Sequence, residues 1–125
     1  MALAVRLDTL FAAHRGKLIL LFWVAMTFAL VMALLPKPPP IPGQPTDKIQ
    51  HIAAFAVLTI LSVPAYPAWR WMTRFGWLAL FGALIEVGQM IPALGRSADV
   101  ADWLADSAAI LITMGITALL DRWLR

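Results

Sequence analysis

The sequence predicts an all-α membrane protein, a bundle of four transmembrane helices preceded by a short N-terminal interfacial helix. The chain of 125 residues has a mean hydropathy of +0.80, and only 14% of its residues are charged. These values lie outside the range of soluble domains. The apolar residues form runs close to the roughly 20 residues that a helix needs to cross a bilayer. Prolines separate these runs, as expected at the ends of helices.

The N-terminal segment, residues 1–16, is expected to form a helix that lies on the membrane surface. Leu3, Leu7 and Leu10 recur there at helical spacing, with charged residues among them, a pattern typical of amphipathic interfacial helices. The rest of the chain, residues 17–125, is expected to form the transmembrane domain. Its four predicted spans are residues 17–35, 47–63, 72–91 and 99–121.

Proline and capping residues set the limits of these spans. Six of the nine prolines fall within residues 36–45, which predicts a stiff, extended crossing between the first two spans. Thr46 is a suitable N-cap for the second span, and Asp47 places a negative charge in its first turn. Pro64 is expected to end the second span and Pro92 to follow the third.

The basic residues indicate the orientation. Seven of the ten Lys and Arg fall on one side of the predicted spans, and the other three are Lys37, Lys48 and Arg96. Because basic residues concentrate in cytoplasmic loops, both termini are expected in the cytoplasm. The net charge of +3 and the pI near 10.0 then reflect topology, and no nucleic-acid partner is expected. The chain has no Cys, which excludes disulfides and thiolate metal sites.

This topology gathers the polar residues of the spans at one end of the bundle, on the outer side. The second span begins there, the third ends there and the fourth begins there. If the fourth span is helical from Asp99, then Asp99, Asp102 and Asp106 lie along one face. Their negative charges need partners such as basic side chains, cations or shared protons. The full set consists of Asp47, Lys48, His51, Glu86, Gln89, Arg96, Asp99, Asp102 and Asp106.

Three short motifs at the ends of the spans resemble the VanZ-like family of small bacterial membrane proteins. They are Asp47-Lys48 followed by His51 and Phe55, then Glu86-x-x-Gln89, then Arg96-Ser97-x-Asp99-x-x-Asp102. The resemblance covers roughly residues 44 to 120. Where the family usually continues with asparagine and glycine, this chain has Asp106 and Ala109. The resemblance implies a multi-pass protein of the bacterial cytoplasmic membrane, related to one that lowers sensitivity to the glycopeptide teicoplanin. It implies no known reaction.

Several roles are open for the polar residues. In an enzymatic interpretation, His51 or Glu86 would act as acid and base, and Asp102 would orient the acid–base group or bind metal. Asp47, four residues before His51, could hold one nitrogen of the imidazole ring. His51, Glu86, Asp102 and Asp106 are the first ligands to test for a divalent metal, although no short metal-binding motif is present. Whether the chain needs a metal cofactor is left open.

Arg96 precedes the fourth span, where an arginine and free helix amides would suit a phosphate of a lipid-linked precursor or a phospholipid headgroup. The alternative is an arginine paired with Asp99 or with ordinary lipid phosphates.

Two functions from different classes follow. The leading hypothesis is an outward-facing polar pocket that recognises or processes an envelope amphiphile such as a lipid-linked phosphate. Asp47, Lys48, Gln89, Arg96, Asp99 and Asp106 would then be its binding residues. The alternative is a non-catalytic membrane protein whose polar residues lock the helices together and which docks a larger envelope complex. A transporter is disfavoured, because no charged path continues to the cytoplasmic side. The sequence does not give the oligomeric state.

Overall fold

Within residues 1–36, 40–43 and 46–125, which the computed structural model describes, the chain is helical and contains no strand. The α-helices of this part are α1 (Ala2–Ala13), α2 (Arg15–Leu34), α3 (Asp47–Ala65), α4 (Trp71–Gln89) and α5 (Val100–Leu124), and a 3₁₀ turn spans Pro92–Leu94. The all-α prediction is therefore confirmed. Residues 37–39 and 44–45, which include Lys37 and part of the predicted proline-rich crossing, lie outside the described residues.

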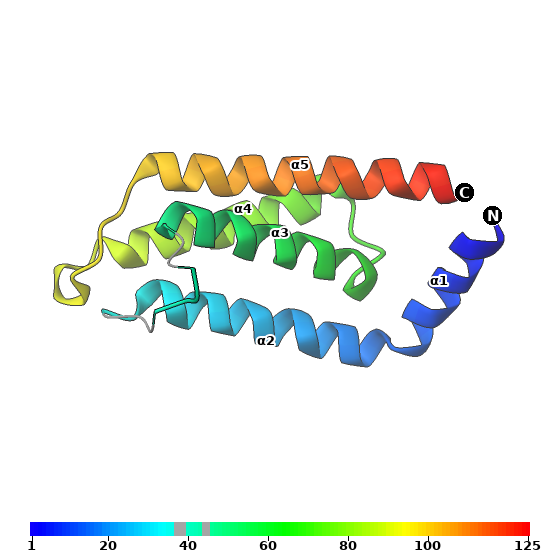
Figure 1. Cartoon of the computed structure of the whole chain (residues 1–125), viewed down its shortest axis with the longest axis horizontal. Helices are drawn as coiled ribbons and strands as arrows, with labels where there is room; N and C mark the ends of the chain where they lie inside the picture. The colour runs from blue at the N-terminus through cyan, green and yellow to red at the C-terminus, as the bar shows by residue number, and fades with distance from the viewer. Residues whose placement is uncertain (37–39, 44–45) are drawn as a thin grey trace.

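Four helices run along the long axis of the molecule, and α1 crosses one end of them (Figure 1). α3 packs against both α2 and α5, and α4 packs against α5. Successive helices alternate in direction. One end of the bundle, here called the polar end, therefore combines the last turns of α2 and α4 with the first turns of α3 and α5 (Figure 1). Both chain termini lie at the opposite end, the terminal end (Figure 1).

The helix limits at the polar end follow from side-chain caps. The Thr46 Oγ1 accepts a hydrogen bond from the Ile49 N–H at 3.3 Å, and the Asp99 carboxylate accepts one from the Ala101 N–H at 2.9 Å. Asp99 therefore lies outside α5 as its N-cap. The expected stripe of three aspartates is reduced to Asp102 and Asp106 for this reason.

The second span extends past its expected end. α3 continues through Pro64 to Ala65, two residues beyond the expected limit. Proline removes one N–H from the helix, but the Tyr66 N–H still donates to the Ser62 carbonyl at 2.9 Å. Near the end of a helix the loss of one bond is tolerated, so Pro64 did not terminate α3.

The core is built from all four long helices. Phe22 of α2, Phe55 and Leu58 of α3, Leu78 of α4 and Ile110 of α5 are each at most 1% exposed. Inside a membrane such packing stabilises mainly through van der Waals contact and close helix approach. These residues hold the four helices at the spacing on which the polar end depends.

At the terminal end a buried arginine closes the turn between α3 and α4. The Arg74 guanidinium donates to Ser62 Oγ and to the Tyr66 carbonyl, both at 3.0 Å, and lies over the ring of Trp71. Arg74 is 2% exposed. α4 begins at Trp71, so Arg74 lies in its first turn and stabilises the end of α3.

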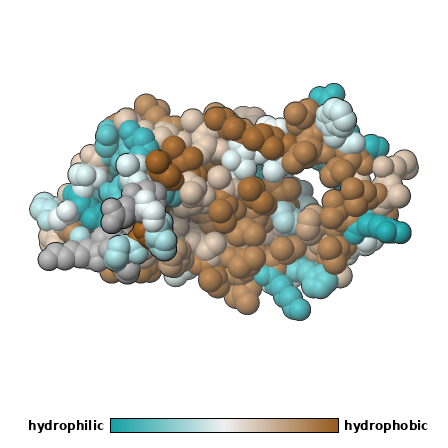
Figure 2. Space-filling model, in the orientation of Figure 1, coloured by the Kyte–Doolittle hydropathy of each residue, from teal (hydrophilic) through white to brown (hydrophobic). Residues whose placement is uncertain are grey.

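The outer surface of the bundle is that of a membrane protein. α2, α3 and α5 are long and apolar enough to cross a membrane. Figure 2 shows hydrophobic residues over the middle of the molecule and hydrophilic residues toward its two ends. Large apolar side chains such as Leu20 and Phe28 are 64% exposed, as expected for contact with lipid. The three apolar helices confirm the coarse prediction, whereas the fourth span, the interfacial position of α1 and the orientation stay predictions.

Candidate functional site

The structure brings the predicted polar residues to the polar end from separate helices. α3 carries Asp47, Lys48 and His51 in its first two turns, and α4 carries Glu86 and Gln89 in its last turn. Four further residues lie before or inside the start of α5: Arg96 and Asp99 precede it, and Asp102 and Asp106 lie in its first two turns. The predicted convergence at one end is thus observed, although these residues form three separate groups.

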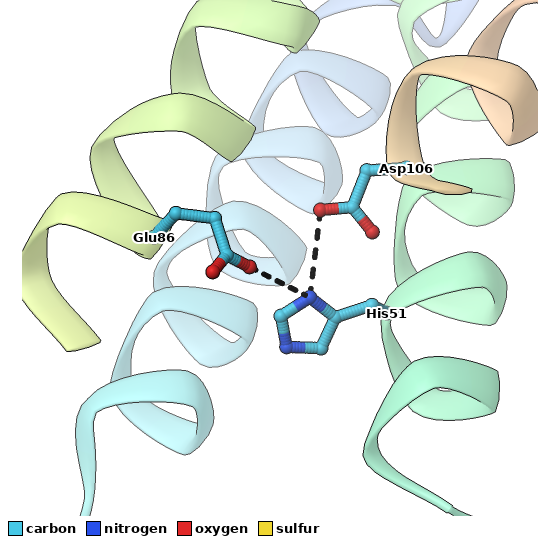
Figure 3. Close-up of side chains that lie close together, drawn as sticks. All are labelled: His51, Glu86 and Asp106. Carbon is cyan, nitrogen blue, oxygen red and sulfur yellow. Dashed lines mark hydrogen bonds and ion pairs between the residues drawn. The ribbon is translucent and has the colours of Figure 1, made fainter. Parts of the chain in front are cut away.

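The central group consists of His51, Glu86 and Asp106, here called the triad. The His51 Nδ1 lies 3.4 Å from Asp106 Oδ2 and 3.9 Å from Glu86 Oε1. Figure 3 shows both carboxylates directed at this ring nitrogen, while the other ring nitrogen points away from them. The exposed fractions are 8% for His51, 9% for Glu86 and 0% for Asp106. The triad therefore concentrates two carboxylates and one imidazole in a nearly dry environment.

Each carboxylate of the triad is only partly satisfied by protein donors. Glu86 Oε2 accepts a hydrogen bond from the Asp99 N–H at 3.0 Å. In the described part of the chain, Glu86 Oε1 and Asp106 Oδ1 are buried and have no hydrogen-bond partner. Buried polar atoms in native proteins are nearly always paired. The triad is consequently incomplete as a hydrogen-bond network.

A glycine on α4 permits the close approach of the three helices that carry the triad. A Cβ at Gly82 would lie 3.2 Å from Phe55 Cζ on α3 and 3.5 Å from Asp106 Oδ2 on α5. An alanine at this position would require the Phe55 ring to shift by a few tenths of an ångström, whereas 3.5 Å to Asp106 is ordinary contact. Gly82 thus lets α4 pack closely against the helices that carry His51 and Asp106.

The other acidic residues have partners outside the triad. Asp102 pairs with Lys48 at 3.7 Å, so the four expected metal ligands reduce to three. Asp47, 67% exposed at its side chain, faces Arg96 at 4.0 Å. The expected contact of Asp47 with the imidazole is not formed at Nδ1, because Asp106 and Glu86 approach that nitrogen instead.

Arg96 and Gln89 fasten the end of α2 to the polar end. The Arg96 Nη1 donates to the Leu35 carbonyl at 3.0 Å, and the Gln89 Nε2 donates to the Ala33 carbonyl at 3.0 Å. The last carbonyls of a helix lack donors within that helix. Arg96 and Gln89 supply these donors at the end of α2. Arg96 pairs with Asp47 and not with Asp99, which had been the alternative partner.

A groove of about 360 Å³ between α2 and α3 leads to the polar end. Its walls are mainly apolar, with Ala29 and Met32 on α2 and Ala54 on α3, while His51 and Arg96 line its polar part. Phe28 and Val57 line it as well and are 64% and 49% exposed, so the groove opens to the side of the bundle. Pockets of this size and character commonly hold small ligands.

The sequence analysis missed the groove. The signal for it is the recurrence of Ala25, Ala29 and Ala33 at four-residue intervals, which leaves one face of α2 without bulk. Chemically, the groove offers an apolar slot that leads to an imidazole and a guanidinium. No protein-family model, curated protein or solved structure matches this chain. Its function therefore has to be argued from this geometry.

Proposed function

We propose that this chain is a VanZ-like protein of the bacterial cytoplasmic membrane that binds an amphiphile with a phosphate headgroup. The acyl or prenyl chain lies in the groove between α2 and α3, and the headgroup lies at the polar end, on the outer side of the membrane. In this proposal α4 is the fourth span, both termini are cytoplasmic, and α1 lies at the inner interface. The 19 residues of α4 correspond to about 28 Å of helix, close to the thickness of the hydrocarbon core.

The observation that carries the proposal is the change in polarity along one continuous groove. From Ala25 to Ala33, nine residues, its α2 wall is apolar, which corresponds to about 12 Å of helix. At the polar end the lining changes to Asp47, His51 and Arg96. Because the groove opens sideways, an amphiphile could enter it from the bilayer without leaving its own leaflet. An apolar slot with a charged end matches a molecule with an apolar tail and a charged head.

Arg96 supports a phosphate as the headgroup. Its side chain lines the groove, is 10% exposed, and makes one hydrogen bond at 3.0 Å and one longer contact at 4.0 Å. A guanidinium carries five N–H donors, so further donors are left for phosphate oxygens. Arginine suits phosphate because its planar fork can bind two oxygens at once. His51 also lines the groove, so in this proposal its imidazole lies next to the bound headgroup.

Processing of the amphiphile is a further step of the proposal. His51 would act as the acid or base. Its ring would be oriented by Asp106 and Glu86, which approach Nδ1. This geometry replaces the Asp102 of the sequence hypothesis, because Asp102 is engaged with Lys48. The link to glycopeptide tolerance rests on the resemblance alone.

Native mass spectrometry of the purified protein tests the binding proposal. The lipids to compare are a polyprenyl phosphate and the uncharged polyprenol of the same length. We expect retention of the phosphate and weak retention of the alcohol. Ala29→Trp should fill the groove and abolish retention, whereas Ala108→Trp places the same bulk at an exposed position of α5 and should leave retention unchanged. Equal retention of both lipids, or retention insensitive to Ala29→Trp, would contradict the proposal.

A second function is favoured by a different observation. Gln89 and Arg96 hold the carbonyls of α2, Lys48 joins α3 to α5, and Glu86 holds the backbone that opens α5. These contacts tie all four helices, as a structural lock would, and leave the outer face free to dock a larger envelope complex. Copurification of one stoichiometric partner that survives Ala29→Trp, with no lipid retained by the parent protein, would favour this second function.

A further inference from the structure

The donor atoms of the triad are arranged like an incomplete metal coordination shell. One imidazole nitrogen and two carboxylate oxygens, from three different helices, all lie within 4.8 Å of one another. Ligands bound tetrahedrally to one zinc ion at about 2.0–2.2 Å lie roughly 3.3–3.6 Å apart. The 3.4 Å between His51 Nδ1 and Asp106 Oδ2 already falls in this range, and the 3.9 Å to Glu86 Oε1 exceeds it by a few tenths of an ångström.

Unpaired buried oxygens point independently to a missing ligand. Asp106 is fully buried and Glu86 is 91% buried by the exposures given above, yet Asp106 Oδ1 and Glu86 Oε1 have no hydrogen-bond partner in the described residues. Leaving a buried acceptor unpaired costs free energy, and more so for a charged group. A cation between the two carboxylates would give Glu86 Oε1 a partner and would balance the buried charge of Asp106, whose Oδ2 faces the same imidazole nitrogen.

The charge of the polar end also calls for a cation. Among the described residues this end carries the carboxyl groups of Asp47, Glu86, Asp99, Asp102 and Asp106 and the basic side chains of Lys48 and Arg96. The acidic groups therefore outnumber the basic ones even when His51 is protonated. A bound divalent ion would offset this excess.

We propose that His51 Nδ1, Glu86 Oε1 and Asp106 Oδ2 bind a divalent transition-metal ion of the zinc type. The nitrogen donor disfavours Ca²⁺ and Mg²⁺, which prefer oxygen ligands alone, and the absence of thiolates disfavours soft ions such as Cu(I). Three protein ligands leave one position of a tetrahedral ion for water or a phosphate oxygen, as in catalytic zinc sites. The proposal goes beyond amphiphile binding and does not depend on it, and a metal ion on Nδ1 would take the place of the acid–base role of His51.

Zinc binding to the full chain in detergent, without added lipid, tests the site. The protein is first stripped with a chelator and then titrated with Zn²⁺, and bound metal is counted by elemental analysis. The reference is the His14→Ala variant, because His14 is exposed and is the only other histidine of the chain. We expect one Zn²⁺ per chain in this reference. His51→Ala and Asp106→Asn, each in that background, should weaken binding at least about tenfold, whereas Asp121→Asn at the exposed terminal end should not.

Two measurements on the His14→Ala reference decide the case if the triad variants fail to fold. Co²⁺ added to the stripped His14→Ala reference should give the visible absorption of a tetrahedral complex, which one equivalent of Zn²⁺ should abolish. Zn²⁺ should also raise the thermal midpoint of the reference. Lack of these two responses, or unchanged Zn²⁺ affinity in folded triad variants, would overturn the site. Because no lipid is present, this failure is distinct from failure of the amphiphile proposal.

Discussion

His51 on α3 and Asp106 on α5 meet across the bundle, with Nδ1 3.4 Å from Oδ2 and with Asp106 fully buried. This contact and the approach of Glu86 to the same nitrogen join three helices through one imidazole ring. A carboxylate buried to this degree depends on its partners, since neither water nor lipid can replace them. The effects of substitutions at His51 and Asp106 on the free energy of unfolding should therefore depend on each other.

A double-mutant cycle measures that coupling. In the metal-free protein, His51→Ala should lower the free energy of unfolding by about 1–3 kcal/mol, because Asp106 loses a partner for a buried charged group. Adding Asp106→Ala should cost less than the two single changes combined, with a coupling of about 0.5–3 kcal/mol. Denaturant unfolding in detergent micelles gives these values. Additive effects would show that the two side chains do not interact.

The glycine beneath the triad gives a second expectation. Gly82→Ala should destabilise the bundle by about 1–3 kcal/mol, because the new methyl group would crowd Phe55 Cζ at 3.2 Å. Gly115 is the matched control, since nothing lies within 4 Å of a Cβ there. Gly115→Ala should be neutral or slightly stabilising, as alanine favours helices over glycine. Equal thermal midpoints for the two variants would contradict the close packing at Gly82.

Much of the architecture was predictable because it depends on the length and spacing of apolar runs. The expected span 72–91 agrees with α4, Trp71–Gln89, and the expected span 99–121 agrees with α5, Val100–Leu124, within a few residues. Because successive helices alternate in direction, the order of the spans was enough to predict which residues lie at the polar end. These features depend on local sequence, which is why hydropathy and prolines were sufficient.

The partners within the polar end were not predictable in the same way. Asp102 and Asp106 lie one turn apart on the same face of α5, and the sequence does not distinguish them as partners of His51. The packing register of α5 against α3 decides that Asp102 meets Lys48 and Asp106 meets the imidazole. Asp99 caps α5 because it directly precedes the first helical residue and its carboxylate accepts the Ala101 N–H. The groove was missed because α2 is apolar on every side, and the four-residue spacing of its alanines does not by itself distinguish a groove from close helix packing.

The buried arginine of the terminal end provides a third test. Arg74→Ala should destabilise the protein by about 2–4 kcal/mol, because Ser62 Oγ and the Tyr66 carbonyl lose a charged donor in a buried setting. Arg70→Ala removes an exposed arginine four residues earlier and should change stability by less than about 0.5 kcal/mol. The two thermal midpoints measured in one detergent give the comparison. A similar loss of stability in both variants would show that the buried hydrogen bonds of Arg74 do not stabilise the protein more than an exposed arginine does.

Topology is accessible because the chain has no native cysteine. Single cysteines at Ala93, which is exposed in the turn at the polar end, and at Pro67, which is exposed at the terminal end, should differ in labelling by a membrane-impermeant maleimide. In intact cells we expect Ala93→Cys to react and Pro67→Cys to react only after lysis. The reverse pattern would place the polar end in the cytoplasm and exclude an outer-leaflet amphiphile.

The central claim is that the groove between α2 and α3 holds a phosphate-bearing amphiphile, and site-specific photo-crosslinking tests it most directly. A benzophenone amino acid at Val57 would lie on the groove, and one at Leu111 would lie on α5 at a similar depth; these positions are 49% and 53% exposed. In vesicles of phosphatidylcholine that contain traces of polyprenyl phosphate and polyprenol, Val57 should capture mainly polyprenyl phosphate, and Ala29→Trp should abolish this capture. Leu111 should capture lipids in proportion to the bilayer composition. Identical lipid profiles at the two positions would contradict the claim.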